Sequence, residues 1–332
     1  MNVLGIETSC DETAASILSN GNLIANVVYT QNIHKKYGGV VPEIASQHHL
    51  NEIIDVIDSA LEKSKLKKND LDGIAVTYGP GLMGSLHVGL NFAKAMSLSL
   101  NIPFLGINHL EGHLYSNYID NDEISFPNVC LLVSGGHTQV WLIKNYSDFE
   151  LIGETLDDAA GEAFDKGARI LGLNYPGGPE IDKISKNGDI NFYQFPRPKV
   201  KNLPYSFSFS GLKTALLYYS QKISKSDFDA NFKDITASYQ EAILDCLFNA
   251  LKNVSIDYQD VNDFYISGGV AANSRLREKA TIFESKYNKK IILPKLEYCT
   301  DNAAMIAMAS YQKMINGQKS NFDLTPNPNL KL

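Results

Sequence analysis

Two histidines four residues apart, His109 and His113, have the spacing in this chain that most clearly permits chemistry. On an α-helix the side chains at i and i+4 share a face, so the two imidazoles could bind one divalent metal ion. The same spacing also occurs on ordinary helices, where each ring nitrogen is hydrogen-bonded or faces water. A third ligand would favour the metal site over an ordinary helix, and the candidate for it, far along the chain, is Asp301. Thr300 or Asp301 could equally be the N-cap of the Ala/Met-rich helix that follows.

The histidine segment differs from the zinc-protease pattern H-E-x-x-H, in which a glutamate directly follows the first histidine. Here Glu111 comes two residues after His109. That offset is a rotation of about 200° on a helix with 3.6 residues per turn. Glu111 would therefore point away from a metal held by the histidines and could not activate a water on it. The geometry disfavours a metalloprotease.

The composition is that of a globular protein, because 332 residues with 44% hydrophobic residues suffice for two domains with their own cores. No apolar stretch reaches the roughly 20 residues needed to span a bilayer, and the chain opens on a strand-like run without a basic leader. We therefore expect a cytoplasmic protein with no membrane partner. The four cysteines form no C-x-x-C pair, so reduced thiols are expected.

The formal net charge of −7 argues against a chain that holds nucleic acid by itself, because phosphate neutralisation dominates such binding. A nucleic-acid role would need a local basic patch or partner proteins. One candidate patch runs from the basic stretch 197–201 through Tyr205, Phe207 and Phe209 to Lys213, interleaving basic and aromatic groups. The alternative is a solvated loop beside a hydrophobic strand, which the sequence alone favours.

The order of predicted strands repeats along the chain. Three apolar runs near the start recur as three apolar runs in the middle; they lie at 3–6, 13–18, 23–29, 129–133, 138–143 and 149–152. After each set, helix-like segments alternate with short apolar runs. This order indicates an internal duplication with two mixed α/β lobes.

We place the first lobe at 1–127 and the second at 128–301, with a segment at about 302–325 packing back on the first. The polar, proline-bearing stretch 187–204 is expected to be an insertion or mobile loop of the second lobe.

Several glycine-rich turns follow predicted strands and expose backbone amides that could hold phosphate oxygens. They lie at 79–85, 134–136, 175–179 and 267–270. Taken singly, each could be only a tight turn, since glycine is the default where φ must be positive. The last turn would join a strand to a helix beginning near Ala271, with Asn273 in its first turns, a layout that suits a nucleotide. None of the turns matches a P-loop or the G-x-G-x-x-G fingerprint.

A further acidic group lies on a predicted helix that follows the second set of strands. Asp158, Glu162 and Asp165 would share one helical face and could line a cleft. The i,i+4 pairs that Lys166 and Arg169 would form with Glu162 and Asp165 are equally what an exposed helix would show.

Taken together, separated motifs of the chain resemble those of the bacterial tRNA N6-adenosine threonylcarbamoyltransferase family. They lie at 5–13, 37–43, 109–113, 132–137, 157–166, 207–213 and 299–302. The resemblance runs from Met1 to about Gly317, and the joint occurrence of these motifs is far more specific than any one of them. One departure is Gln47, which stands where relatives usually carry arginine.

The resemblance implies an α/β, two-lobed actin-like/Hsp70-like ATPase (ASKHA) fold, with duplicated RNase H-like domains and a ligand cleft between the lobes. Family members move a threonylcarbamoyl group from threonylcarbamoyl-AMP to the N6 amine of adenosine at position 37 of tRNAs that read codons beginning with adenine. The chain would then be an acyltransferase. By the family pattern, His109, His113 and Asp301 would hold one iron or zinc ion, which could polarise the carbamoyl carbonyl or orient the phosphate.

Carried over position by position, a second set of residues would bind threonylcarbamoyl-AMP, or ATP/ADP in the same cleft. They are Leu132, Val133, Ser134, Gly135, Gly136, Asp165, Gly178, Asp182 and Asn273. The glycine amides would approach the phosphate, and the two aspartates would accept hydrogen bonds from ribose hydroxyls. Asp11 and Glu12 would be the catalytic carboxylates, which position the substrate or take up the amine proton.

The partners implied by the resemblance are tRNA, a degenerate paralogue of the same fold that pairs with the first lobe, a small P-loop ATPase, and a synthase that supplies threonylcarbamoyl-AMP. The acidic charge agrees with a subunit that binds tRNA poorly alone. Two rival functions stay open. One is an ATP-dependent small-molecule kinase or ATPase of the same fold, with incidental histidines, and the other is a chaperone-like module that uses nucleotide only as a switch.

Overall fold

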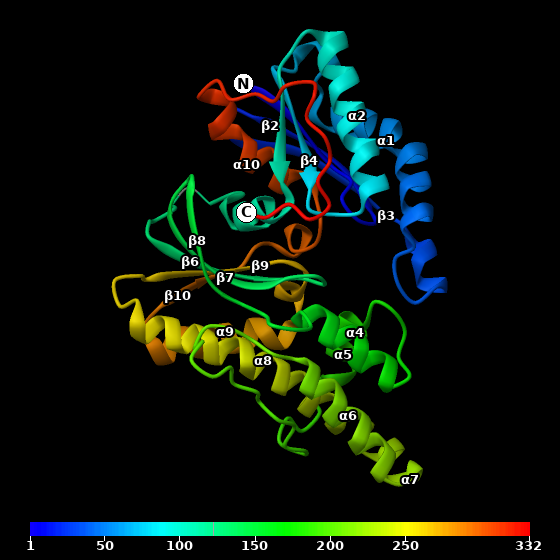
Figure 1. Cartoon of the computed structure of the whole chain (residues 1–332), viewed down its shortest axis with the longest axis vertical. Coiled ribbons are helices and arrows are strands. Elements are labelled where there is room, and N and C mark those ends of the chain that lie inside the picture. Colours follow the sequence, from blue (N-terminus) through cyan, green and yellow to red (C-terminus); the bar gives the residue numbers. More distant parts are fainter. Residues whose placement is uncertain (122) are drawn as a thin grey trace. The chain divides into compact units, whose positions relative to one another are not determined.

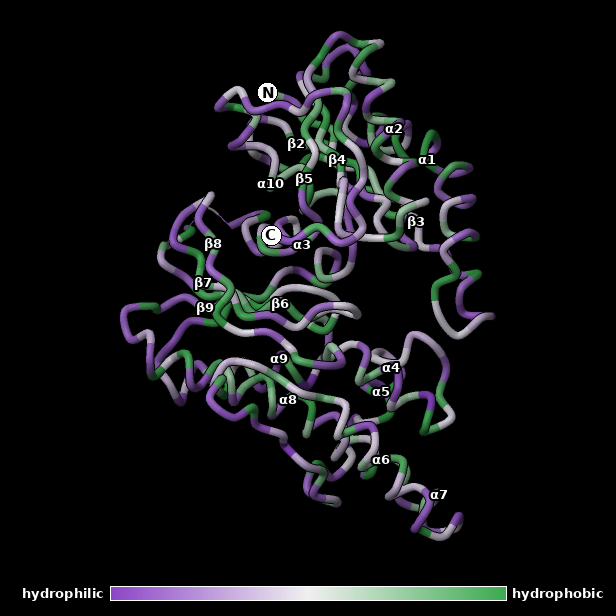
Figure 2. Tube along the Cα trace, viewed as in Figure 1, coloured by the Kyte–Doolittle hydropathy of each residue, from purple (hydrophilic) through white to green (hydrophobic). Residues whose placement is uncertain are grey.

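The computed structural model describes residues 1–121 and 123–332, which divide into two compact units (Figure 1). Unit 1 comprises Met1–Ile124 and Thr300–Leu332, and unit 2 comprises Ser125–Cys299. Each unit contains one five-stranded sheet with helices packed on it. Hydrophobic residues gather along the strands of both sheets (Figure 2).

Unit 1 has a mixed sheet in the order β3-β2-β1-β4-β5, in which β1, β2 and β3 are antiparallel and β1, β4 and β5 are parallel. Its elements are β1 (Asn2–Glu7), β2 (Glu12–Ser19), β3 (Asn22–Thr30), α1 (Pro42–Ser64), β4 (Gly73–Gly79), α2 (Met83–Leu100), β5 (Phe104–Asn108), α3 (His109–Tyr115) and α10 (Ala303–Ile315). Helices α1 and α2 cover one face and α10 the other (Figure 1).

The central strand β1 is apolar along nearly its whole length because both faces of the sheet are covered. Leu4 and Ile6 belong to the core shared with α1 and α2. Gly5 faces the opposite side, where a Cβ would lie 2.5 Å from the carbonyl oxygen of Ala303 at the start of α10. The close approach of α10 therefore requires glycine at this position.

Unit 2 repeats this sheet in the order β8-β7-β6-β9-β10, with β6, β7 and β8 antiparallel and β6, β9 and β10 parallel. Its elements are β6 (Asn128–Val133), β7 (Thr138–Asn145), β8 (Asp148–Glu154), α4 (Ala160–Ile170), α5 (Gly177–Ser185), α6 (Ser210–Lys222), α7 (Lys225–Ala230), α8 (Phe232–Asp257), β9 (Asp263–Ser267), α9 (Ser274–Tyr287) and β10 (Lys290–Ile292). The predicted repeat of strand order is confirmed.

The polar stretch 187–204 lies alongside α8, a largely buried helix of unit 2 that comes later in the chain. The hydroxyl of Ser238 on α8 accepts a hydrogen bond from the amide of Tyr193 at 3.1 Å and donates one to the carbonyl of Asp189 at 3.1 Å. The side chain of Phe195 is inserted into the core. This stretch is therefore anchored along the helix.

The candidate basic and aromatic patch is not formed. Phe207 and Phe209 are 2% and 0% exposed and belong to the core of unit 2, so they offer no surface for a base to stack on. The guanidinium of Arg197 is paired with Asp245 at 3.0 Å. The alternative interpretation, a hydrophobic strand beside a loop, holds for these residues. In the described part of the chain, none of the helices combines the length and the apolar character that crossing a membrane requires.

Candidate active site

Helix α3 presents the histidine pair directly after strand β5. The side chain of Asn108 accepts a hydrogen bond from the amide of Leu110 at 2.8 Å, so this N-cap starts the helix at His109. Both imidazoles are buried. A Cβ on Gly112 would lie 2.7 Å from Cδ1 of Ile306, so glycine lets α3 pack closely on α10. This packing brings the segment before α10 to the histidines.

Asp301 completes the cluster. Its Oδ1 atom lies 3.1 Å from Nε2 of His113 and 3.5 Å from Nε2 of His109. The N-cap of α10 is instead Asn302, whose side chain accepts a hydrogen bond from the amide of Met305 at 3.0 Å. Asp301 is therefore not the helix cap, which was the alternative left open by the sequence.

The donor set of His109, His113 and Asp301 fits a metal ion. One ligand atom from each side chain lies within 4.8 Å of the others. Ligands about 2.1 Å from one tetrahedral ion are about 3.4 Å apart, close to the two distances to Asp301. Two imidazoles and one carboxylate suit zinc or iron. Glu111 points elsewhere, as predicted, and its carboxylate pairs with Lys313 at 2.5 Å.

A residue that the sequence analysis missed, Glu7, contacts the Nδ1 atom of His109. Glu7, at the end of β1, is 0% exposed, and its Oε2 atom lies 3.1 Å from Nδ1 of His109. The same oxygen accepts a hydrogen bond from Oγ1 of Thr77 at 2.5 Å, and Oε1 accepts one from the amide of Ser9 at 2.5 Å. The signal in the sequence was a glutamate that ends an otherwise apolar strand.

The charges of the neighbouring carboxylates favour the protonated form of His109. Burial lowers the pKa of His109, but the carboxylates of Asp301 and Glu7 outweigh it and raise this pKa to about 9. Burial raises the pKa of Glu7, and the charge and hydrogen bond of His109 reverse this, so the net direction is downward. A bound metal would take the place of the imidazole proton.

Asp11 and Glu12 follow β1 at the entry to β2 in unit 1. Burial, followed by the nearby carboxylates of Asp301 and Asp11, raises the pKa of Glu12 well above its ordinary value. The charge of Asp301, a member of the histidine and aspartate cluster, therefore acts on Glu12.

In unit 2, the predicted glycine turns 134–136 and 267–270 lie at the carboxyl ends of neighbouring parallel strands, β6 and β9. The prediction that the turn 175–179 also follows a strand is wrong, because this segment connects α4 to α5. Leu132 and Val133 end β6, and Ser134 closes the turn to β7 by donating its amide hydrogen bond to the carbonyl of His137 at 2.8 Å. A Cβ at Gly135 or Gly136 would meet nothing within 4 Å, so this backbone is open to a ligand. Such an edge is where open α/β sheets bind ligands.

Helix α4 begins later than predicted. It starts at Ala160 because Ala159 has an extended backbone (ψ 160°), so Asp158 precedes the helix and does not share a face with Glu162. Lys166 still pairs with both, at 2.7 Å and 2.8 Å. The prediction of one three-residue acidic helical face is wrong, whereas the predicted ion pair between Glu162 and Lys166 is confirmed.

Asp165 on α4 is directed at the start of α5. Its Oδ1 atom accepts a hydrogen bond from the amide of Gly177 at 2.7 Å. Burial raises the pKa of Asp165, and the amides of Gly177 and Gly178 partly oppose this shift. A Cβ on Gly178 would have one neighbour, 3.9 Å away, so this part of the α5 N-terminus is open.

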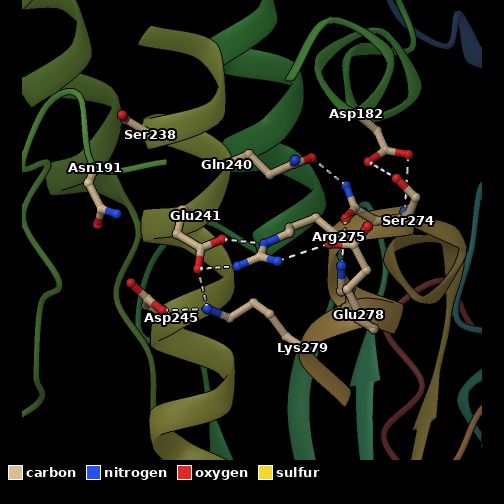
Figure 3. Close-up of polar contacts among 12 residues, drawn as sticks. Asp182, Asn191, Ser238, Gln240, Glu241, Asp245, Ser274, Arg275, Glu278 and Lys279 are labelled. Atoms are coloured by element: carbon tan, nitrogen blue, oxygen red, sulfur yellow. Dashed lines mark hydrogen bonds and ion pairs between the residues drawn. The ribbon is translucent and has the colours of Figure 1, made fainter. Parts of the chain in front are cut away.

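Asp182 and Asn273 both lie at the N-terminus of α9, where Figure 3 shows Asp182 facing Ser274. Both carboxylate oxygens of Asp182 accept hydrogen bonds from Ser274, one from the hydroxyl at 2.8 Å and one from the amide at 3.0 Å. Asn273 is the N-cap of α9, and its Nδ2 atom donates to Oε1 of Gln240 at 2.7 Å. The helix thus begins at Ser274 and not near Ala271, because residues 269–272 form a 3₁₀ turn.

An ion-pair network fixes α9 on α8 beside these residues (Figure 3). Glu241 on α8 accepts from Arg275 at 2.8 Å and from Lys279 at 2.5 Å, and Lys279 also reaches Asp245 at 2.6 Å. Glu241 is buried, so these bonds compensate a charge that would otherwise be costly. The sequence analysis did not identify this network, because its partners lie on different helices.

The structure therefore groups the predicted residues into two sets. The metal-ligating residues and the pair Asp11 and Glu12 lie in unit 1, and the predicted nucleotide contacts lie in unit 2.

Comparison with known proteins agrees with the family resemblance. The family model described as tRNA N6-adenosine threonylcarbamoyltransferase matches residues 22–308. The protein of that name from Thermosipho africanus (strain TCF52B) is 52% identical over 333 residues, covering 100% of both chains. The one from Thermosipho melanesiensis (strain DSM 12029 / CIP 104789 / BI429) is 50% identical, covering 99% of this chain and 100% of the relative.

Two solved structures share the fold at low sequence identity. Component A of the Acidaminococcus fermentans (R)-2-hydroxyglutaryl-CoA dehydratase superposes with a TM-score of 0.56 at 16% identity, covering 95% of this chain and 99% of that chain. HypF from T. kodakarensis superposes with a TM-score of 0.59 at 15% identity, covering 95% of this chain and 47% of that chain. Both have the actin-like ATPase type of fold, which confirms the fold class.

Proposed function

The chain belongs to the tRNA N6-adenosine threonylcarbamoyltransferase family and is a tRNA-modifying transferase, and from this premise we propose that it acts through a metal centre formed by His109, His113 and Asp301. One observation carries the proposal: two buried imidazoles direct their Nε2 atoms at the same carboxylate oxygen. The donor is threonylcarbamoyl-AMP, and the acceptor is the N6 amine of a tRNA adenosine.

The bound ion, iron or zinc, would supply Lewis-acid chemistry toward the donor, and three protein ligands leave positions open for it. In the transfer, the amine nitrogen bonds to the carbamoyl carbon, the bond from that carbon to the phosphate oxygen breaks, and AMP leaves with the electron pair. The amine must also lose a proton. We propose that Asp11 and Glu12 are the carboxylates that position the substrate or take up this proton.

The open turn and helix N-termini of unit 2 support a nucleotide site there. The amides of Gly135 and Gly136 suit phosphate oxygens, and a carboxylate held by existing hydrogen bonds still has lone pairs for ribose hydroxyls. We therefore retain Leu132, Val133, Ser134, Gly135, Gly136, Asp165, Gly178, Asp182 and Asn273 as the proposed contacts to threonylcarbamoyl-AMP, or to ATP/ADP.

The partner proteins are also proposals. A degenerate paralogue would pair with unit 1, a small P-loop ATPase would assist, and a synthase would supply the donor. Support for a protein partner comes from α1, where Leu50 and Ile54 are 66% and 57% exposed at i,i+4 spacing. The net charge of −7 supports shared tRNA binding. We also propose that the reaction takes place in the cytoplasm, where a tRNA substrate would be met.

Transfer of labelled threonine into tRNA tests this function. The purified chain is combined with the synthase, ATP, bicarbonate and the partner proteins, and wild type is compared with the double variant His109→Ala/His113→Ala. Exposed His87 on α2 provides the matched control, His87→Ala. We expect label in tRNA with wild type and the control but not with the double variant. Equal transfer by the double variant would refute the metal centre, and ATP turnover without any transfer would favour the kinase or ATPase alternative.

A further inference from the structure

The two histidines of the metal centre differ in what contacts their other ring nitrogen. Nδ1 of His109 lies 3.1 Å from Oε2 of Glu7 and 3.1 Å from Oγ of Ser9. Nδ1 of His113 is buried and has no hydrogen-bond partner among the described residues. We infer that Glu7 is a positioning residue that fixes the tautomer and ring orientation of His109, so that Nε2 is free to ligate the metal. This inference rests on the proposed metal centre.

A neutral imidazole carries its proton on one nitrogen and its ligating lone pair on the other. Nε2 of His109 faces Asp301, so ligation there requires the proton on Nδ1 and an acceptor for it. The hydroxyl of Ser9 can donate or accept, so it accommodates either tautomer. The ionised carboxylate of Glu7 only accepts, and it therefore selects the form with the proton on Nδ1.

The surroundings of Glu7 explain why a glutamine could not replace it. Oε1 faces the amide of Ser9, which is an obligatory donor, while Oε2 faces Nδ1 of His109 and the hydroxyl of Thr77. A carboxamide has one oxygen and one NH₂ group. With its NH₂ toward the Ser9 amide, two donors would face each other. With its NH₂ toward the imidazole, Nδ1 would have to accept, and the proton would move to Nε2 and block ligation.

The position of this carboxylate in the fold also favours a functional role. Glu7 ends the central strand of the unit 1 sheet, and Thr77 lies on the neighbouring strand β4. Transfer of a charged group from water into the protein costs several kcal/mol, and this cost can exceed the energy gained from a buried ion pair. Stability alone therefore does not explain a buried carboxylate at this position. The carboxylate has hydrogen-bond donors on both oxygens and is rigidly placed behind one metal ligand. That is the arrangement in which an outer carboxylate orients a ligating histidine.

Zinc affinity measured by competition with a chromophoric chelator tests the inference without an activity assay. Glu7→Gln should weaken zinc binding about 10- to 100-fold, the effect typical of losing such a partner. Glu241→Gln is the matched control, because this glutamate is also buried and charge-paired, with Arg275 and Lys279, but lies in unit 2 and contacts none of the proposed metal ligands. The control should bind zinc like wild type. Equal zinc affinity of folded Glu7→Gln and wild type would overturn the inference and leave the metal centre standing.

A second measurement needs no variant and covers the case in which Glu7→Gln does not fold. Long-range proton–nitrogen NMR of the zinc-loaded wild type reports which imidazole nitrogen carries the proton. We expect zinc on Nε2 and the proton on Nδ1 of His109, and zinc on Nδ1 would overturn the inference. If wild type binds no zinc, or if Asp301→Ala and His113→Ala bind it as well as wild type does, the metal centre itself fails, and this inference fails with it.

Discussion

The Nε2 atom of His113 lies 3.1 Å from the Oδ1 atom of Asp301, although the two residues are separated by 188 positions in the sequence. The contact depends on how closely α3 and α10 pack. Asn108 and Asn302 cap the two helices and set where each begins. The geometry of the metal centre is therefore sensitive to changes at the α3–α10 contact that touch no ligand.

Gly112→Val should separate α3 from α10, because even a Cβ at this position would lie 2.7 Å from Cδ1 of Ile306. Overpacking of this kind costs about 1–3 kcal/mol of stability. We expect a lower unfolding free energy together with weaker zinc binding. The control is Gly39→Ala, where a Cβ meets nothing within 4 Å. Zinc affinity that stays at the wild-type value in Gly112→Val would refute the coupling of helix packing to the metal centre.

Substitution of Asn273 can separate its capping role from its proposed contact with the donor. Asn273→Ser keeps an oxygen for the N-cap, whereas Asn273→Ala loses it, at a cost of about 1 kcal/mol. Both variants lose the amide that Gln240 orients. We expect the KM for threonylcarbamoyl-AMP to rise roughly two- to tenfold in both, the equivalent of one hydrogen bond. A wild-type KM in Asn273→Ser would remove Asn273 from the donor site.

We expect Asp157 to stabilise unit 2 in a pH-dependent way. Its carboxylate accepts hydrogen bonds from the amides of Phe209 and Ser210, at 2.7 Å and 3.3 Å, and so caps α6 from a distant loop. Burial alone would raise the pKa of Asp157, but its hydrogen bonds to Ser208, Phe209 and Ser210 lower it overall. Because the native pKa lies below the unfolded value of about 3.9, the stabilisation is complete above that pH and is lost as the pH falls through the native pKa.

Asp157→Ala should therefore lower the unfolding free energy by about 1 kcal/mol at neutral pH, and the difference from wild type should shrink in acid. Trp141, the single tryptophan, is buried in β7 of unit 2 and reports unfolding of that unit by fluorescence in urea. Asp58→Ala, at an exposed position of α1, serves as the control. A difference that stays constant from pH 7 to pH 3 would contradict the assignment.

The isolated chain should bind tRNA weakly and with strong dependence on salt. The net charge is −7, and Arg197 of the candidate basic patch is engaged with Asp245. Two neutralised phosphates would give an affinity that falls about tenfold between 50 and 200 mM salt. Fluorescence anisotropy with labelled tRNA measures this, and addition of partner proteins should restore tight binding. Tight, salt-insensitive binding by the chain alone would contradict the need for partners.

The sequence predicted the fold and the site best where residues of one chemical type recur at a regular spacing. The repeated strand order is visible because the central strands are buried along nearly their whole length and form continuous apolar runs. The histidine spacing at His109 and His113 predicts two ligands on one helix. Asp301 could be proposed as the third metal ligand, but the sequence could not decide between this role and that of a helix cap. The histidines that it contacts lie on a helix far away in the sequence. The cap assignment at Asn302 settled that point.

The missed and misplaced features share a physical cause. Glu7 acts through contacts that the sheet creates with β4 and α3, and no local pattern marks such a contact. The starts of α4 and α9 were misplaced because extended residues and a 3₁₀ turn precede them. Phe207 and Phe209 had the composition of a nucleic-acid surface, but tertiary packing placed them in the core.

The most direct test of the metal centre is to strip the wild-type chain with a chelator and return zinc or ferrous iron in steps, measuring threonylcarbamoyl transfer to tRNA and bound metal together. Transfer that is lost on stripping and returns linearly to a maximum at one ion per chain is the predicted result, with neither binding nor recovery in Asp301→Ala. Full transfer by the stripped chain would contradict the account.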